Sequence, residues 1–307
     1  MRLGIYLGGH LFTGRELDFV RLAKVAEDAG LDDVALGEHL VIGGENPTPP
    51  WGRFVHRKDE PFPEPLATLA VIAGATSRIR LITAILIAPL RAPVLLAKTA
   101  ATVHALSNGR LVLGISTSWH AEEYAAVGVP FAERGQRLDD AVGACRALWS
   151  SAPARFDSPT VSFEDLYCVP RPERVDDLPI WFTGKMRKQL VRRVAQFGHG
   201  WLPWLGLDTP LAPLAADIQV LKDAVQAAGR DPTRLDVAVR FRAMGRSLEQ
   251  AFEEDVPIML RAGITQAHVP LLSLVPTLDE APRAIERIAR IFESYRNVGV
   301  SSIISKT

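Results

Sequence analysis

A (β/α)₈ barrel (TIM barrel), in which eight parallel strands are surrounded by helices, is the α/β fold that the sequence predicts. Three observations support it. Short apolar segments alternate with helical patterns eight times along the chain. The 307 residues suit one barrel, which we expect to form a single domain over residues 1–307. The first segment ends Gly8-Gly9-His10, so it lacks the G-x-G-x-x-G fingerprint of many doubly wound open sheets.

The candidate strands are short, and the early ones are apolar almost throughout. This composition is typical of parallel strands, which are buried on both faces. The predicted strands are Leu3–Gly8, Asp33–Glu38, Arg80–Ala88, Leu111–Ser116, Pro179–Thr183, Gly200–Trp204, Arg234–Arg240 and Gln266–Leu272.

A helical pattern follows each candidate strand. Apolar residues recur at helical spacing between Leu17 and Ala29. A further helix is predicted to begin at Pro93, because proline suits a first turn, and to end at residues 107–109. The last helix is predicted to begin near Thr277–Glu280, where Thr followed three residues later by Glu indicates a capping box.

Two long segments interrupt this alternation. Residues 39–63 are rich in Pro and Gly, and they follow the carboxyl end of a strand, where barrel active sites lie. Their Trp51 and Phe54 are therefore candidate lid residues. Residues 151–178 follow a helix and so begin on the opposite face. The pattern around Ser162 predicts a short hairpin there that reaches back toward the active-site face.

Composition excludes several classes of protein. The 35 basic and 35 acidic residues give no net charge, so there is no global basic field for nucleic acid. The two cysteines, Cys145 and Cys168, form no metal-binding pattern, and we expect reduced thiols and no metal site. No signal peptide is recognisable, and the most apolar stretch is about half the ~20 residues of a membrane span. A cytoplasmic protein without a membrane segment is predicted.

The residues at the carboxyl ends of the strands limit the possible chemistry, since barrel enzymes place function there. A metal-dependent hydrolase would show His-x-His on the first strand, which offers only His10. A glycosidase needs two carboxylates at strand ends, and Glu38 alone is obvious. Imidazoles, small hydroxyl residues and tryptophans remain, and these suit a flat aromatic cofactor. Glu122 and Glu123 are interpreted as first-turn residues that complement a helix dipole.

Several motifs occur together in the first two thirds of the chain. They are Glu64-Pro65-Leu66, residues 75–81 (ATSRIRL), residues 88–98 (APLRAPVLLAK), residues 106–111 (LSNGRL), Trp119 with Glu122-Glu123, residues 128–135 (GVPFAERG), Gly184, Arg192-Arg193 and Gly198-His199-Gly200-Trp201. In this combination the chain resembles the bacterial-luciferase-like monooxygenase family, whose members are flavin- or deazaflavin-dependent oxidoreductases.

The resemblance implies where a cofactor would bind. In deazaflavin-dependent members a His at the end of the second strand lies near the reactive carbon, and His39 after Glu38 fits this place. His39 and Trp119 are the predicted catalytic residues, for proton transfer and for a wall of the substrate pocket. Thr83-Ala84-Ile85 corresponds to a stretch that often contains a non-proline cis peptide behind the cofactor ring. The predicted cofactor-binding residues are Glu38, Thr83, Ala84, Thr117, Ser118, Thr183, Gly184, Lys185 and Arg187.

The chain also departs from the family pattern. Ser116 and Ser118 replace glycines of a G-x-G-x-G-W motif, and Lys185 and Arg187 replace a Gly and a Ser in a later loop. His199 replaces a common Asp. We expect these positions to lie where the cofactor binds, with Lys185 and Arg187 holding a phosphate through charge-assisted hydrogen bonds.

The functional prediction is an oxidoreductase that uses coenzyme F420 for hydride transfer to or from a small organic substrate. Two alternatives stay open. One is an FMN-dependent monooxygenase, which would need a separate reductase. The other is a non-catalytic cofactor- or ligand-binding barrel, which the departures would favour. Related proteins are often dimers, so a homodimer is expected.

Overall fold

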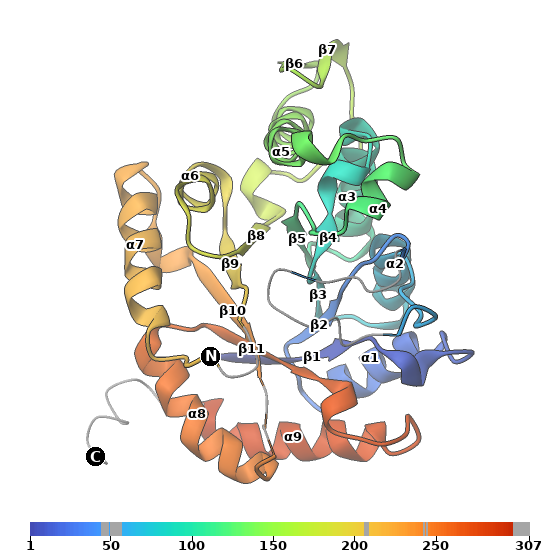
Figure 1. Cartoon of the computed structure of the whole chain (residues 1–307), viewed down its shortest axis with the longest axis vertical. Coiled ribbons are helices and arrows are strands. Elements are labelled where there is room, and N and C mark those ends of the chain that lie inside the picture. The colour runs from blue at the N-terminus through green and yellow to red at the C-terminus, as the bar shows by residue number, and fades with distance from the viewer. Residues whose placement is uncertain (44–48, 50–56, 206–208, 242, 244, 297–307) are drawn as a thin grey trace.

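Parallel strands closed into a barrel form the centre of the computed structural model, with helices around them (Figure 1). The structure describes residues 1–43, 49, 57–205, 209–241, 243 and 245–296. The barrel strands are β1 (Arg2–Leu7), β2 (Asp33–Leu36), β3 (Arg80–Thr83), β4 (Leu86–Ile87), β5 (Leu111–Ser116), β8 (Ile180–Gly184), β9 (Gly200–Pro203), β10 (Asp236–Arg240) and β11 (Gln266–Pro270). The predicted (β/α)₈ barrel is confirmed.

Strands β3 and β4 are the two halves of the predicted third strand. A cis peptide bond between Ala84 and Ile85 separates them, at the stretch to which the family resemblance pointed. Both halves pair with β5, and β3 also pairs with β2, so the sheet closes into a barrel of eight strand positions within the described residues.

Each barrel strand is followed by a helix, as the alternation predicted. These helices are α1 (Asp18–Asp28), α2 (Pro65–Ala75), α3 (Pro93–Leu106), α5 (Arg134–Ser150), α6 (Lys188–Phe197), α7 (Leu214–Ala227), α8 (Leu248–Ala262) and α9 (Ala281–Arg296). A short additional helix, α4 (Ala121–Ala126), lies between β5 and α5. Single 3-10 turns are His10–Phe12, Ala88–Leu90, Phe131–Glu133, Val175–Asp177, Pro232–Arg234 and Leu271–Ser273.

The two long segments differ from each other. Residues 151–178 contain the predicted hairpin, formed by β6 (Ala154–Asp157) and β7 (Ser162–Leu166). The expectation that it reaches back to the active-site face is wrong: the hairpin packs on α5 and projects outward beyond it (Figure 1). The ring of Phe156 packs against Gly143 of α5, where a Cβ would leave no room for it. In the first segment, Trp51 and Phe54 lie outside the described residues.

The barrel interior is filled by side chains rather than open. Side chains of alternate strand residues point inward, and six of them form a buried cluster at mid-height. The cluster consists of Tyr6, Ala35, Ile82, Val112, Trp181 and Ala238.

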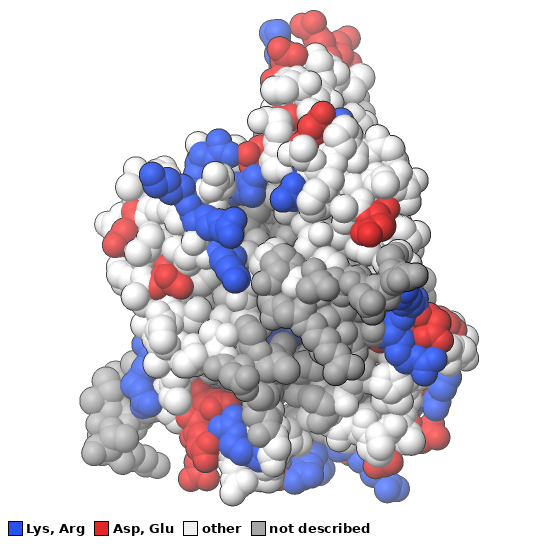
Figure 2. Space-filling view, in the orientation of Figure 1, with Lys and Arg blue, Asp and Glu red and all other residues white. Residues whose placement is uncertain are grey.

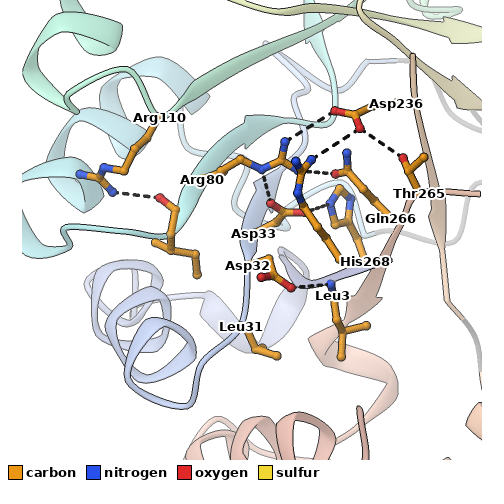
Figure 3. Close-up of polar contacts among 12 residues, drawn as sticks. Leu3, Leu31, Asp32, Asp33, Arg80, Arg110, Asp236, Thr265, Gln266 and His268 are labelled. Atoms are coloured by element: carbon orange, nitrogen blue, oxygen red, sulfur yellow. Dashed lines mark hydrogen bonds and ion pairs between the residues drawn. The ribbon is translucent and has the colours of Figure 1, made fainter. Parts of the chain in front are cut away.

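A charged cluster closes the interior at the amino-terminal ends of the strands (Figure 3). Arg80, the first residue of β3, lies 2.7 Å from Asp33 and 3.6 Å from Asp236, and it donates to Gln266 at 2.5 Å. His268 Nε2 lies 3.4 Å from the second oxygen of Asp33. Burial by itself raises the pKa of Asp33, but the contacts with His268 and Arg80 outweigh it and lower the pKa to about 2. The Asp33 carboxylate is paired on both oxygens, although the side-chain nitrogen of Gln266 is buried without a hydrogen-bond partner among the described residues. We interpret the cluster as a structural plug.

No helix in the part of the chain that the structure describes is long and apolar enough to cross a membrane.

Candidate active site

His39 follows β2 at the carboxyl-terminal end of the barrel, where the prediction placed it. Its side chain is only 13% exposed. The ring packs edge-on against Phe62, with centroids 5.0 Å apart, and against Trp119, with centroids 5.9 Å apart. Trp119 follows β5, so the ends of two separate strands bring the two predicted catalytic residues together.

A buried carboxylate lies directly behind His39. Glu123, in the first turn of α4, has a fully buried side chain. Its Oε1 accepts a hydrogen bond from the Leu40 amide at 2.7 Å and lies 3.3 Å from Nδ1 of His39. Its Oε2 accepts one from the Ser118 hydroxyl at 3.1 Å. The interpretation of Glu123 as a first-turn residue that complements the helix dipole was therefore incomplete, because its carboxylate joins the ends of β2 and β5.

A second His–Glu pair lies beside the first and is used differently. His120 Nε2 accepts a hydrogen bond from the Gly43 amide at 3.0 Å, so this nitrogen carries no hydrogen. Its Nδ1 then carries the hydrogen and lies 3.0 Å from Glu122. The Nε2 bond thus holds the segment after β2, and the Nδ1 contact fixes the ring against the first turn of α4.

Ser118 departs from the family glycine in sequence but not in backbone conformation. Its φ is +55°, in the left-handed region that favours glycine. The Ser118 hydroxyl donates to the buried Glu123 carboxylate. The replacement therefore adds a contact to this end of the barrel and keeps the glycine-like turn.

Glu38 is buried and engaged by the protein itself. Its carboxylate accepts hydrogen bonds from the Ile87 amide at 2.6 Å and from both terminal nitrogens of Arg91, which also contacts Glu64 at 2.6 Å. Burial raises the pKa of Glu38, and Arg91 opposes the rise. These bonds fasten the end of β2 to β4, just beyond the Ala84-Ile85 peptide.

The predicted hydroxyl residues are distributed around the mouth of the barrel. Thr83 is buried and donates to the Gly114 carbonyl at 2.8 Å, and Ala84 packs on the interior cluster. Thr183 donates to the Leu202 carbonyl at 2.5 Å. Thr117 is partly buried, and its carbonyl accepts a hydrogen bond from Tyr124.

The loop after β8 presents the predicted phosphate-binding residues at the rim. Gly184 has a φ of +143°, and a Cβ at this position would meet nothing within 4 Å. Lys185, Arg187 and Lys188 are exposed at the start of α6, and Figure 2 shows Lys and Arg side chains gathered over this helix. None of the three makes an ion pair with another described residue. Open backbone and unpaired cations fit an anionic group of a cofactor.

His199 does not belong to this end, and the expectation that it lies at the cofactor site is wrong. It precedes β9, so it lies at the amino-terminal end of the barrel. Its Nδ1 accepts a hydrogen bond from the Ile180 amide at 3.2 Å, and it lines a cavity of about 190 Å³ with Asp176 and Arg230. Burial lowers the pKa of His199 to about 4.

Sequence reasoning also did not single out Arg240 at the end of β10. Its guanidinium lies 4.1 Å from the centroid of the ring of Tyr6, and it is the Tyr6 side chain that belongs to the interior cluster. Ala238, two residues earlier on β10, belongs to the interior cluster, so Arg240 lies on the same face of the strand, exposed at the mouth of the barrel. Within the described residues no set of three or more His, Cys, Asp or Glu side chains forms a metal-binding cluster.

The sequence model of the luciferase-like monooxygenase family matches residues 1–301. The chain belongs to this family. The prediction from the motifs is thereby confirmed, and so is the assignment to the oxidoreductases.

Individual relatives are more distant. The chain is 28% identical over 299 residues to the F420-dependent glucose-6-phosphate dehydrogenase of Kineococcus radiotolerans, covering 94% of this chain and 82% of that protein. Among solved structures, the monooxygenase RslO1 from Streptomyces bottropensis is 21% identical, with a TM-score of 0.74 and coverage of 96% and 99%. An F420-dependent secondary alcohol dehydrogenase in complex with an F420–acetone adduct is 16% identical, with a TM-score of 0.75 and coverage of 94% and 98%. The two structures support the fold.

Proposed function

We propose that this chain is an F420-dependent oxidoreductase that moves a hydride to or from a small organic substrate, with His39 exchanging the accompanying proton. The observation that carries the proposal is the His39 ring, which lies between Glu123 and Trp119 at the active-site end of a luciferase-like barrel. The likeness to an F420-dependent dehydrogenase over 94% of the chain supports the choice of cofactor.

In this proposal the loop after β8 would hold the phosphate end of the cofactor, and residues near the Ala84-Ile85 peptide would orient its ring. Lys185 and Arg187 would bind its phosphate, the open backbone at Gly184 would allow close approach, and Ala84 would line the ring. When bound, the deazaflavin supplies a carbon that accepts or gives a hydride. For an alcohol substrate, the C–H electron pair and hydrogen leave as hydride, and the O–H proton passes to His39, which leaves a ketone or aldehyde.

Glu38 has a supporting role in this proposal. Both of its oxygens already accept hydrogen bonds from Ile87 and Arg91, so we assign it to fixing the wall that Ala84 and Ile85 form. Thr83 and Thr183 act in the same way, since their hydroxyls bind backbone carbonyls.

The first test is a fluorescence titration of the purified protein with F420 and, separately, with FMN. We expect F420 to bind more tightly. The His39→Ala variant should keep the F420 affinity but lose most of the turnover, typically about 100-fold or more for a proton-transfer residue. Arg155→Ala, an exposed change on the distant β6–β7 hairpin, serves as the control and should retain both. Tight binding of FMN alone would replace the proposal with oxygen chemistry. Binding of neither cofactor to the folded protein would favour a barrel that has lost catalysis.

A further inference from the structure

Glu123 is a buried group in contact with His39 to which the proposed function assigns no role of its own. We infer that Glu123 is the positioning residue for His39: it holds the neutral imidazole with its hydrogen on Nδ1 and stabilises the ring when it carries a second proton. The inference rests on the proposed role of His39 in proton transfer, and it assigns the residue that makes this role possible.

The contacts of Glu123 fix which ring nitrogen is protonated. A carboxylate can only accept hydrogen bonds, so the nitrogen that lies 3.3 Å from Oε1, which is Nδ1, carries the hydrogen. In the neutral ring the lone pair is then on Nε2, and this nitrogen is the one that takes up a proton. The Leu40 amide and the Ser118 hydroxyl hold the two carboxylate oxygens from either side, which keeps the carboxylate in place.

Burial makes the charge of Glu123 effective. Its side chain is fully buried and that of His39 is 13% exposed, so little solvent screens the pair. A negative charge in contact with an imidazole favours the protonated ring. A residue that accepts a proton from the substrate becomes positively charged, and a neighbouring carboxylate stabilises that charge.

Among the residues that the structure describes, the neighbouring carboxylates Glu122 and Glu38 have partners other than His39. Glu122 lies against Nδ1 of His120, whose ring centroid is 6.2 Å from that of His39. Glu38 is bound by Arg91, which also contacts Glu64. His120 cannot take the same role while its Nε2 accepts the Gly43 amide. The two adjacent His–Glu pairs therefore divide the work, with one holding the loop and the other serving the chemistry.

A purely structural role for Glu123 makes a different prediction. The carboxylate also binds the Leu40 amide, so its loss could loosen the segment after β2 without any effect on the ionisation of His39. The Glu123→Gln change separates the two roles. Glutamine keeps the shape and an oxygen that can accept from Leu40 and from the ring, and it removes the charge. Its NH2 group then faces Ser118, whose hydroxyl oxygen can accept a hydrogen bond in place of donating one. Glu122→Gln removes the same charge one residue away and is the matched control.

The test is nitrogen-15 NMR of the full-length protein labelled at its histidines, without cofactor. The seven histidines make assignment tractable, and His39→Gln identifies the His39 signals. Couplings to the ring hydrogens distinguish Nδ1 from Nε2. We expect the wild-type neutral ring to carry its hydrogen on Nδ1. In the neutral ring, Glu123→Gln should lower the ratio of the Nδ1–H form of His39 to the Nε2–H form by about threefold or more, because a neutral amide accepts a weaker hydrogen bond than a carboxylate. Glu122→Gln should change it far less and should act on His120 instead.

Three results would overturn the inference. They are a wild-type ring with its hydrogen on Nε2, a Glu123→Gln protein with an unchanged His39 ratio, and an equal effect of Glu122→Gln. The first needs no change at Glu123, so it can be obtained even if Glu123→Gln does not fold. Because the spectra are recorded without cofactor, a failure to bind F420 would defeat the proposed function and leave this result intact. Where turnover is measurable, Glu123→Gln should lower kcat and leave the F420 affinity unchanged.

Discussion

Replacing Asp33 with Asn tests whether the amino-terminal plug of the barrel is structural. The carboxylate is fully buried, and the change keeps its shape but removes the charge that faces Arg80 and His268. Lowering the pKa of Asp33 from 3.8 to about 2 corresponds to ~2.5 kcal/mol of folding free energy at neutral pH. Breaking a buried ion pair costs about 3–5 kcal/mol, and Arg80 keeps Asp236 and Gln266 as partners. We therefore expect Asp33→Asn to lower the free energy of unfolding by about 3 kcal/mol.

The pH dependence provides a second, independent signature. Because the pKa of Asp33 is lower in the folded protein than in the unfolded chain, its contribution is complete above about pH 4 and disappears as the pH falls toward 2. About 1 kcal/mol of it should be gone by pH 3. The gap in stability between the wild type and Asp33→Asn should narrow by this amount between pH 5 and pH 3.

Urea unfolding followed by circular dichroism at pH 7, 5, 4 and 3 measures both quantities. Asp28→Asn is the control, since this exposed carboxylate pairs with Lys24 on the surface, where such pairs contribute roughly 1 kcal/mol at most. F420 binding should be unchanged in Asp33→Asn, because Asp33 lies at the end of the barrel opposite the proposed site. A loss below about 1 kcal/mol, or a gap that does not narrow in acid, would refute the account of the plug.

Three further predictions concern other parts of the barrel. The pKa of His199 is lowered to about 4, so the unfolded chain binds a proton that the folded protein resists. The wild type should lose stability as the pH falls from about 6.5 to 4, and His199→Gln should flatten the urea-midpoint curve in that window. Ser118→Ala and Ser118→Gly both lose the hydrogen bond to Glu123. The positive φ at this position is unfavourable for alanine but not for glycine. Calorimetry should therefore find the Ser118→Ala protein less stable than the Ser118→Gly protein by about 1 kcal/mol. Changing both Lys185 and Arg187 to Ala should weaken F420 binding by about tenfold or more and reduce the salt dependence of binding. An equal loss of affinity in the distant Arg155→Ala control would argue against a phosphate site at these residues.

The strands of the fold could be predicted because burial on both faces leaves a strong sequence signal. An apolar run such as Leu111–Ser116 has few alternatives, and the observed β5 has the same bounds. The placement of the β6–β7 hairpin could not be predicted in this way. Alternation indicates that two strands pair, but it does not say which surface they rest on. Here the hairpin rests on α5, where Phe156 packs against Gly143. This contact joins two residues whose sequence patterns are unrelated.

The candidate site was predicted only in part, for a related reason. His39 and Trp119 meet because they follow strands whose ends converge, and a strand end can be read from the sequence. Glu123 was missed because Glu122 and Glu123 look alike in a first helical turn. Successive helical residues point about 100° apart, so one of them can face the barrel while the other faces solvent. Which of the two does so depends on how α4 packs against the segment after β2, and the sequence does not encode that locally.

The two ends of the barrel differ in whether their charged side chains are paired. One end contains the structural plug, and the other is the end proposed to bind ligand. At the amino-terminal end, Arg80 lies between Asp33 and Asp236, so its charge is already neutralised inside the protein. At the carboxyl-terminal rim, Lys185 and Arg187 have no carboxylate partner among the described residues, although the whole chain carries as many acidic as basic groups. An unpaired cation contributes little to folding, but it attracts an anion without first having to break an ion pair. Although the overall composition is balanced, the cations at this rim have no carboxylate partner among the described residues, and this asymmetry supports the proposal that a phosphate-bearing cofactor binds here.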